Sequence, residues 1–149
     1  MKTKAILRSF SVLLMSIFLA ACSKNTSPPA PPVSNTFPLY NHSSGTAKAA
    51  GSFTLFQLEG GKVSINIQLD ADYFVPGIML DAYLVTCDTC SLIYTSLGSV
   101  NGNTGAGSTP ALKTNGNNEA ILYDSLITKK GYAVKILNGS NVQAVGAIQ

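Results

Sequence analysis

The stretch Val63-Ser64-Ile65-Asn66-Ile67-Gln68-Leu69 decides the fold of this chain. Its apolar and polar residues alternate strictly, and a period of two is the pattern of a β-strand that buries one face. Burying the four apolar side chains contributes roughly 6 to 12 kcal/mol before entropy costs. Upstream, Phe53, Leu55 and Gln57 alternate with Thr54, Phe56 and Leu58, and Glu59-Gly60-Gly61-Lys62 separates the two runs. The pattern therefore predicts a β-hairpin over residues 53–69.

Further strands are expected downstream of a turn at Pro76-Gly77. Residues 78–86 are apolar on both faces, which predicts a central strand between two packed layers. Other strands are predicted over residues 91–98, 119–123, 132–137 and 142–148. Residues 101–110 are mostly Gly, Asn, Ser and Thr, which favours an exposed loop. The fold class that follows is all-β, an antiparallel sandwich or barrel of about seven or eight strands.

The N-terminal residues have the pattern of an export signal. Lys2, Lys4 and Arg8 precede an apolar run that closes with Leu19-Ala20-Ala21-Cys22. This motif resembles the lipobox of bacterial lipoproteins, in which Cys22 takes a diacylglyceryl group and becomes the mature N-terminus. The resemblance implies that acyl chains on Cys22 hold the protein on a membrane. An ordinary secretory signal and an uncleaved anchor are the alternatives.

The lipobox divides the chain into three parts. Residues 1–21 are the predicted lipoprotein signal peptide, and residues 22–37 are the lipidated Cys22 and a tether that carries four prolines. Such a composition gives an extended spacer. Residues 38–149 are the predicted single β-sandwich domain. The residue after Cys22 is Ser23, which in similar Gram-negative lipoproteins favours the outer membrane, facing the periplasm or the cell surface.

Charge and composition exclude one class of partner. Of the ten Lys and Arg, three lie before Cys22, so the mature chain has seven cations and seven acids. It contains no Arg, the residue best suited to bidentate contacts with phosphates and bases. No nucleic-acid partner is expected.

With Cys22 lipidated, Cys87 and Cys90 are the remaining cysteines. They lie in a predicted tight turn and in an oxidising compartment, where a structural disulfide is the expected outcome. Asp88 between the two disfavours a reactive thiolate, yet a redox-active pair stays an alternative. Metal binding is a third, since two thiolates suit Cu(I) or Zn but a closed zinc site needs four ligands.

The polar side chains suggest few other sites. Asp70 and Asp72 share a face after the strand at 63–69, so a weak calcium site is conceivable beside the simpler interpretation of a solvated strand end. His42, the single His, stands beside Ser43 and Ser44 in a polar stretch, where it is expected to be solvated. No catalytic residue and no cofactor beyond the covalent lipid is predicted.

The order of motifs in the domain resembles the DM-thirteen family, a β-rich module found beside DOMON domains and proposed to transfer electrons. Residues 77–84 match its Gly-Pro-x-Leu-x-Val-Tyr-Leu pattern at Gly77, Leu80, Tyr83 and Leu84. Residues 97–105 echo its Leu-Gly-x-Leu-x-Gly-x-x-Gly segment, and residues 44–67 and 132–147 resemble its first and last strands. The family's redox cysteine corresponds to Leu137 or Asn138, so the resemblance implies a fold without that redox centre.

These observations predict a membrane-anchored exported lipoprotein whose β-sandwich is a non-enzymatic binding or structural module. Its expected partners are the membrane, through the lipid on Cys22, and an envelope protein or glycan. A DM-thirteen-like electron-transfer module that uses Cys87 and Cys90 is one alternative, and a metal-binding envelope lipoprotein is another.

Overall fold

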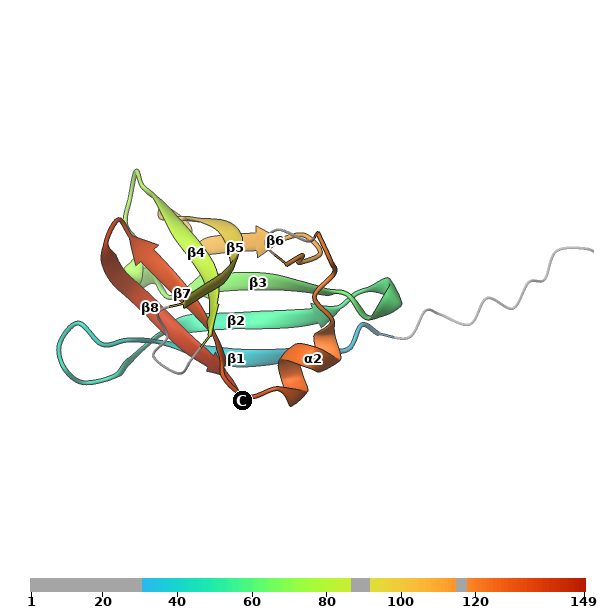
Figure 1. Ribbon diagram of the computed structural model, residues 1–149. Helices are drawn as coiled ribbons and strands as arrows, with labels where there is room; N and C mark the ends of the chain where they lie inside the picture. Colours follow the sequence, from blue (N-terminus) through green and yellow to red (C-terminus); the bar gives the residue numbers. More distant parts are fainter. Residues whose placement is uncertain (1–30, 87–91, 115–117) are drawn as a thin grey trace, which may run out of the picture. The chain divides into compact units, whose positions relative to one another are not determined.

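The computed structural model describes residues 31–86, 92–114 and 118–149 (Figure 1). Pro32–Gln149 forms one compact unit. The described residues contain one short helix, two single 3-10 turns at Glu59–Gly61 and Ala71–Tyr73, and eight strands. The strands are β1 (Ser34–Asn41), β2 (Lys48–Gln57), β3 (Val63–Leu69), β4 (Met79–Thr86), β5 (Leu92–Asn101), β6 (Ala106–Thr109), β7 (Tyr132–Asn138) and β8 (Asn141–Ile148), and the helix is α2 (Tyr123–Thr128).

All eight strands belong to one antiparallel sheet, in the order β5-β4-β7-β8-β1-β2-β3-β6. The sheet curls until its two edges, β5 and β6, lie next to each other, and the Thr109 hydroxyl on β6 donates a hydrogen bond to the Leu97 carbonyl on β5. The predicted all-β fold is confirmed. It is a nearly closed barrel and not a two-layer sandwich, because one continuous sheet encloses the core.

The β2–β3 hairpin follows its sequence pattern closely. Val63, Ile65, Ile67 and Leu69 are buried, while Asn66 and Gln68 are exposed. The apolar residues of β3 face those of β2 in register, as in the pairs Phe53 with Ile67 and Leu55 with Ile65. The strands are joined by the 3-10 turn, where Gly60 and Gly61 both take a φ of 72°. The predicted hairpin is confirmed, and β2 starts earlier, at Lys48.

Strand β4 matches the expectation of a central strand only in part. It lies between β5 and β7 in the sheet, and Leu84 and Val85, on opposite faces, are both buried. Met79 at its start is 59% exposed. The prediction of two packed layers around it is wrong, because the sheet closes on itself and leaves most of the outer face to solvent.

Residues 101–110 are not the exposed loop that their composition predicts. Ala106–Thr109 forms β6 and pairs with β3 from Gln68 to Ile65. Gly102 and Gly105 are buried, and a Cβ on Gly102 would overlap the carbonyl oxygens of Val75 and Ile78. The glycines here let two backbone segments pack closely. Glycine is equally common in turns, so the local composition alone does not distinguish the two uses.

The predicted strand at 119–123 is also wrong. Only two isolated bridges form there, Lys113 with Ala120 and Lys62 with Leu122, and the chain then enters α2. Tyr123 and Leu126 are buried one helical turn apart, at 3% and 1% exposure. Since a short apolar run fits a strand or a buried helical turn equally well, contacts with the barrel decide between them.

Strand β1 begins at Ser34, ahead of the predicted domain start at residue 38. It pairs with β2 along its length, and Phe37 stacks on Phe53 with ring centroids 5.3 Å apart. Its only paired residues with β8 are Tyr40 and Val145, so a proline at position 38 interrupts little pairing on that side. Residues 34–37 therefore belong to the barrel.

Antiparallel order places the connections alternately at two ends of the barrel. The β2–β3 connection and the described part of the β6–β7 connection lie at one end, with the start of β1, the end of β8 and α2 (Figure 1). We call this the α2 end. No helix in the described ranges is long and apolar enough to cross a membrane.

Candidate functional site

The residues singled out by sequence do not come together in one site. Cys22, Cys87 and Cys90 lie outside the described residues, so their predicted roles stay predictions. The described strands on either side of Cys87 and Cys90 are neighbours, since Thr86 at the end of β4 pairs with Leu92 at the start of β5. Asp70 and Asp72 are both exposed after β3, and His42 is exposed after β1. Within the described residues, no three His, Cys, Asp or Glu side chains form a group that could hold a metal ion.

A pocket at the α2 end brings together residues that the sequence did not single out. It has a volume of about 200 Å³ and lies between β5, the start of β7, the chain before α2, and α2 itself. We call it the tyrosine pocket. Aromatic, apolar and polar residues line it together: Tyr94, Thr114, Glu119, Ala120, Ile121, Leu122, Ser125, Leu126, Lys129 and Tyr132.

Two tyrosines from strands at opposite sides of β4 form one wall of the pocket. Tyr94 and Tyr132 meet edge to face, with ring centroids 5.3 Å apart and an angle of 64° between the planes. In β5 the register shifts, so that Thr95 pairs with Leu84 while Ile93 pairs with Val85, and Tyr94 is the extra residue. Such bulges redirect a side chain without ending a strand. Tyr132 opens β7 and pairs with Thr86 on β4.

The electrostatics of the pocket act on the Tyr94 hydroxyl. Burial raises the pKa of Tyr94, and Tyr132 raises it further through charge repulsion and a side-chain hydrogen bond. Lys129 lowers this pKa and Glu119 raises it. Both charged groups therefore lie within electrostatic range of the same hydroxyl. The tyrosine stays protonated at neutral pH and can donate and accept hydrogen bonds.

The opposite wall is held to the barrel by hydrogen bonds. Leu112 N–H donates to the Val63 carbonyl at 2.9 Å, and Ile121 N–H donates to the Leu112 carbonyl at 3.0 Å. The Tyr123 hydroxyl accepts a hydrogen bond from Asn35 Nδ2 at 2.9 Å, which fastens α2 to the start of β1. Ile121 and Leu126 are almost fully buried. These contacts make the wall part of the folded domain.

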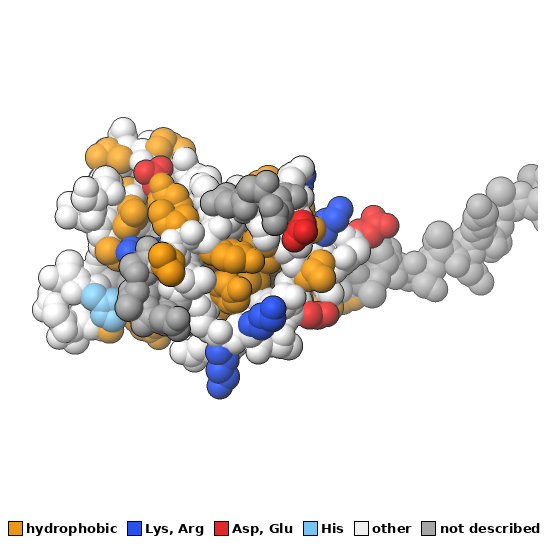
Figure 2. All heavy atoms as spheres, viewed as in Figure 1, with side chains coloured by type: hydrophobic (Ala, Val, Ile, Leu, Met, Phe, Trp, Pro, Cys, Tyr) orange, Lys and Arg blue, Asp and Glu red, His pale blue; other side chains and the backbone are white. Residues whose placement is uncertain are grey.

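The surface around the pocket combines apolar and charged side chains. In the view of Figure 2, hydrophobic side chains gather between the strands and α2, with Lys, Asp and Glu side chains at the border. Leu122 is 45% exposed at this end. Every described Asp, Glu and His is exposed, so no buried acid or base is available beside the tyrosine hydroxyls. The arrangement is suited to binding.

A larger hollow of about 430 Å³ lies on the outer face of β2, β3 and β6. Its polar lining residues are uncharged. Some of them already have partners on neighbouring strands: the hydroxyls of Thr36 and Thr54 share a hydrogen bond of 2.8 Å, and the Ser108 hydroxyl donates to Asn66 Oδ1 at 2.8 Å. It lacks the aromatic and charged groups that converge in the tyrosine pocket. Ligand sites favour concave, largely apolar surfaces with a few polar groups, so the tyrosine pocket is the stronger candidate.

Sequence reasoning missed Tyr94 and Tyr132 because both were assigned to strands, where an aromatic residue usually packs. One signal was available. Tyr94 and Tyr132 both lie near the ends of predicted strands, and the mouth of a barrel, where strands end, is a common place for a ligand site. No protein-family model, curated protein or solved structure matches this chain.

Proposed function

We propose that this protein is a lipid-anchored, non-enzymatic binding module of the bacterial cell envelope, and that it binds a small ligand in the tyrosine pocket. Lipid attachment rests on the motif Leu19-Ala20-Ala21-Cys22. Binding rests on one observation, the convergence of two tyrosines, two opposite charges and an apolar wall on a pocket of about 200 Å³. Enzymatic activity is not proposed, since the pocket pairs no nucleophile with a buried base.

The barrel's topology is consistent with a tether. The start of β1 lies at the α2 end, so a chain anchored at Cys22 enters the barrel at the end that carries the pocket. Residues 23–33 supply the proposed spacer. The ligand is expected in the envelope space.

Anchoring is tested with the full chain and the Cys22→Ser variant, both expressed with the signal peptide in a Gram-negative host. We expect the wild type in the outer-membrane fraction, with a mass increase of a diacylglyceryl group and added acyl chain. The variant should lose both. Equal membrane attachment and mass behaviour in the two proteins would contradict the lipoprotein assignment.

Pocket binding is tested with full-length protein carrying ¹³C-labelled tyrosine. The probes are single amino acids, neutral monosaccharides and nucleosides, each titrated separately. We expect at least one class to move the ring signals of Tyr94 and Tyr132 in a saturable manner while Tyr40, on the outside of β1, stays unchanged. If all three classes leave both rings unmoved, the pocket is not a small-ligand site.

The redox alternative rests on Cys87 and Cys90. The connection that contains them begins at Thr86, the residue paired with Tyr132 at the tyrosine pocket. Thiol alkylation with mass spectrometry in defined redox buffers measures the potential of the pair. A value below about −300 mV marks a structural disulfide, and a higher value supports a DM-thirteen-like electron-transfer role. Elemental analysis of the purified protein tests the metal-binding alternative in the same preparation.

A further inference from the structure

We propose that the tyrosine pocket binds a free amino acid with an apolar side chain, recognised as a zwitterion. This inference rests on the proposed function, because it names the ligand class of the same pocket. It is carried by two opposite charges, Glu119 and Lys129, that line a pocket with an aromatic and aliphatic interior. An amino acid presents the complementary pair, an ammonium group and a carboxylate, next to an apolar side chain.

The two charges are available for a ligand. Glu119 lies in the chain before α2, and Lys129 is the residue that ends the helix. Both residues line the same pocket, and both act electrostatically on the Tyr94 hydroxyl. No ion pair joins either of them to another of the described residues. A zwitterion can pair its ammonium group with Glu119 and its carboxylate with Lys129, and each charged hydrogen bond is stronger than a neutral one.

The remaining polar groups favour the same orientation. Tyr94 and Tyr132 line the pocket and each carries a hydroxyl, and Ser125 on α2 is a third hydroxyl residue in the lining. Hydroxyls donate to a carboxylate as readily as they accept from an ammonium group. They can therefore complete the hydrogen bonding of either charged end once the two ionic contacts set its position.

The apolar lining and the size restrict the ligand further. Ile121, Leu122 and Leu126 line the side of the pocket formed by α2 and the chain before it. A volume of about 200 Å³ is below the range of about 300 to 1,000 Å³ that is typical of sites for drug-sized ligands. A single amino acid is small enough, whereas a folded peptide segment is not. A ligand with a carboxylate alone would meet Glu119 without compensation.

The experiment uses the full-length protein in detergent and isothermal titration calorimetry. The probes are L-leucine, L-leucinamide, N-acetyl-L-leucine and glucose. L-Leucine carries both charges, L-leucinamide lacks the carboxylate, N-acetyl-L-leucine lacks the ammonium group, and glucose has neither. We expect saturable binding of L-leucine and at least tenfold weaker binding of each of the other three.

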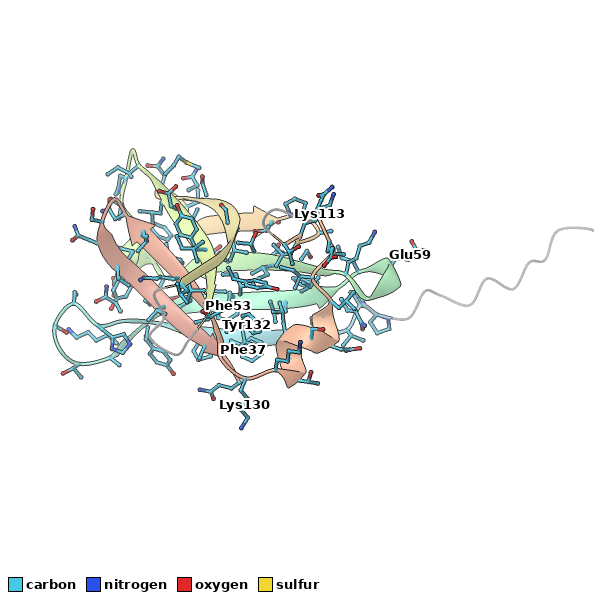
Figure 3. All side chains as sticks on the ribbon, viewed as in Figure 1. Phe37, Phe53, Glu59, Lys113, Lys130 and Tyr132 are labelled. Carbon is cyan, nitrogen blue, oxygen red and sulfur yellow. The ribbon has the colours of Figure 1, made fainter. Side chains whose placement is uncertain are left out.

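Matched variants separate the pocket charges from general electrostatics. Lys129→Met and Glu119→Gln should each weaken L-leucine binding at least tenfold. Lys130→Met and Glu59→Gln are the controls, because Lys130 points away from the barrel and Glu59 lies at the tip of the β2–β3 connection (Figure 3). Both controls should bind L-leucine as the wild type does. Thermal unfolding of each variant verifies that it is folded.

Four results would overturn the inference. Equal affinity for L-leucine and N-acetyl-L-leucine would show that the ammonium group is not recognised. Equal losses in Lys129→Met and Lys130→Met would show that the position of the cation does not matter. Binding of glucose without binding of L-leucine would refute the zwitterion and leave the proposed binding module standing. If single amino acids, neutral monosaccharides and nucleosides all fail to bind, both the zwitterion inference and the proposed binding function are refuted.

Discussion

The β2–β3 hairpin and the segment from residue 101 to residue 131 reach their structures by different routes. In the hairpin, alternation along the chain already assigns each side chain to a face, and the structure keeps that assignment. In the second segment, glycine-rich and apolar runs become β6, two isolated bridges and α2 through contacts with distant residues. The tyrosine pocket is built largely from this second segment.

The difference shows where a local sequence pattern is sufficient to determine the structure of a segment. Period-two alternation over seven residues leaves one arrangement that buries four apolar side chains, so competing structures are strongly disfavoured. Residues 101–131 have no such period. Their backbone follows the hydrogen bonds that β3, the β3–β4 connection and β5 supply, such as Val75 N–H to the Gly102 carbonyl at 2.9 Å. Four changes test this comparison, from the largest expected effect to the smallest.

The Gly102→Ala substitution should have the largest effect, because the added Cβ would overlap the carbonyl oxygens of Val75 and Ile78. We expect the free energy of unfolding to fall by more than about 3 kcal/mol. Gly77→Ala is the matched control: Gly77 has a φ of 80° and open space around it, so its cost should be about 1 kcal/mol. Urea denaturation measures both, and equal losses would show that close packing at Gly102 is unimportant.

The Ile65→Ala substitution tests the hairpin. Ile65 is fully buried opposite Leu55, and its truncation should lower the free energy of unfolding by about 2 to 5 kcal/mol. Its neighbour Ser64 faces the other side of β3, and Ser64→Ala should change the stability by less than about 0.5 kcal/mol. Thermal and urea unfolding of the two variants measure both losses of stability. Comparable losses would mean that the alternation does not decide the buried face.

The Thr109→Val substitution tests the closure of the barrel. It removes the hydrogen bond from the buried Thr109 hydroxyl to the Leu97 carbonyl, which joins the two edges of the sheet. Valine has a similar shape, so we expect a loss of about 1 to 2 kcal/mol. Hydrogen exchange should quicken at the amides of β6 while those of the β2–β3 pair stay protected. Uniform quickening across both regions would contradict a local role for this contact.

The smallest effect is expected from Tyr94→Phe, seen in the pH dependence of stability. The folded pKa of Tyr94 is raised above the unfolded value of about 10, so the folded state holds this proton more tightly. The stability from this group is complete below pH 10 and is lost as pH rises through the folded pKa. The variant should therefore lose less stability than the wild type in urea titrations above pH 10. Identical slopes would show that Tyr94 is not shielded in the pocket.

Much of the fold was predictable, and the failures have a common cause. The hairpin, β4, β5, β7 and β8 carry alternation or turn residues that act over a few positions. Two strands escaped prediction: β1, because prolines hide its pattern, and β6, because its Ala and Gly have low β-propensity. Each becomes a strand since a neighbour offers a complete row of backbone partners, β2 for Ser34–Asn41 and β3 for Ala106–Thr109.

The pocket was less predictable than the sheet. Tyr94 and Tyr132 are 38 positions apart, and they meet because both strands pair with β4. The bulge that redirects Tyr94 arises from a register shift, and nothing near Tyr94 in the sequence marks it. Glu119 and Lys129 reach the same hydroxyl only after the chain turns into α2.

The sequence by itself determined that this chain folds into antiparallel β-structure, because alternation over seven residues permits one buried face. It also supplied the motif around Cys22 on which the proposed anchoring rests. The tertiary structure decided that the sheet closes into a barrel, that residues 106–109 complete it, and that residues 123–128 become a helix. It also decided the tyrosine pocket. The physical reason is that closure, close glycine packing and convergent side chains depend on partners far away in sequence, whose register only the folded sheet sets.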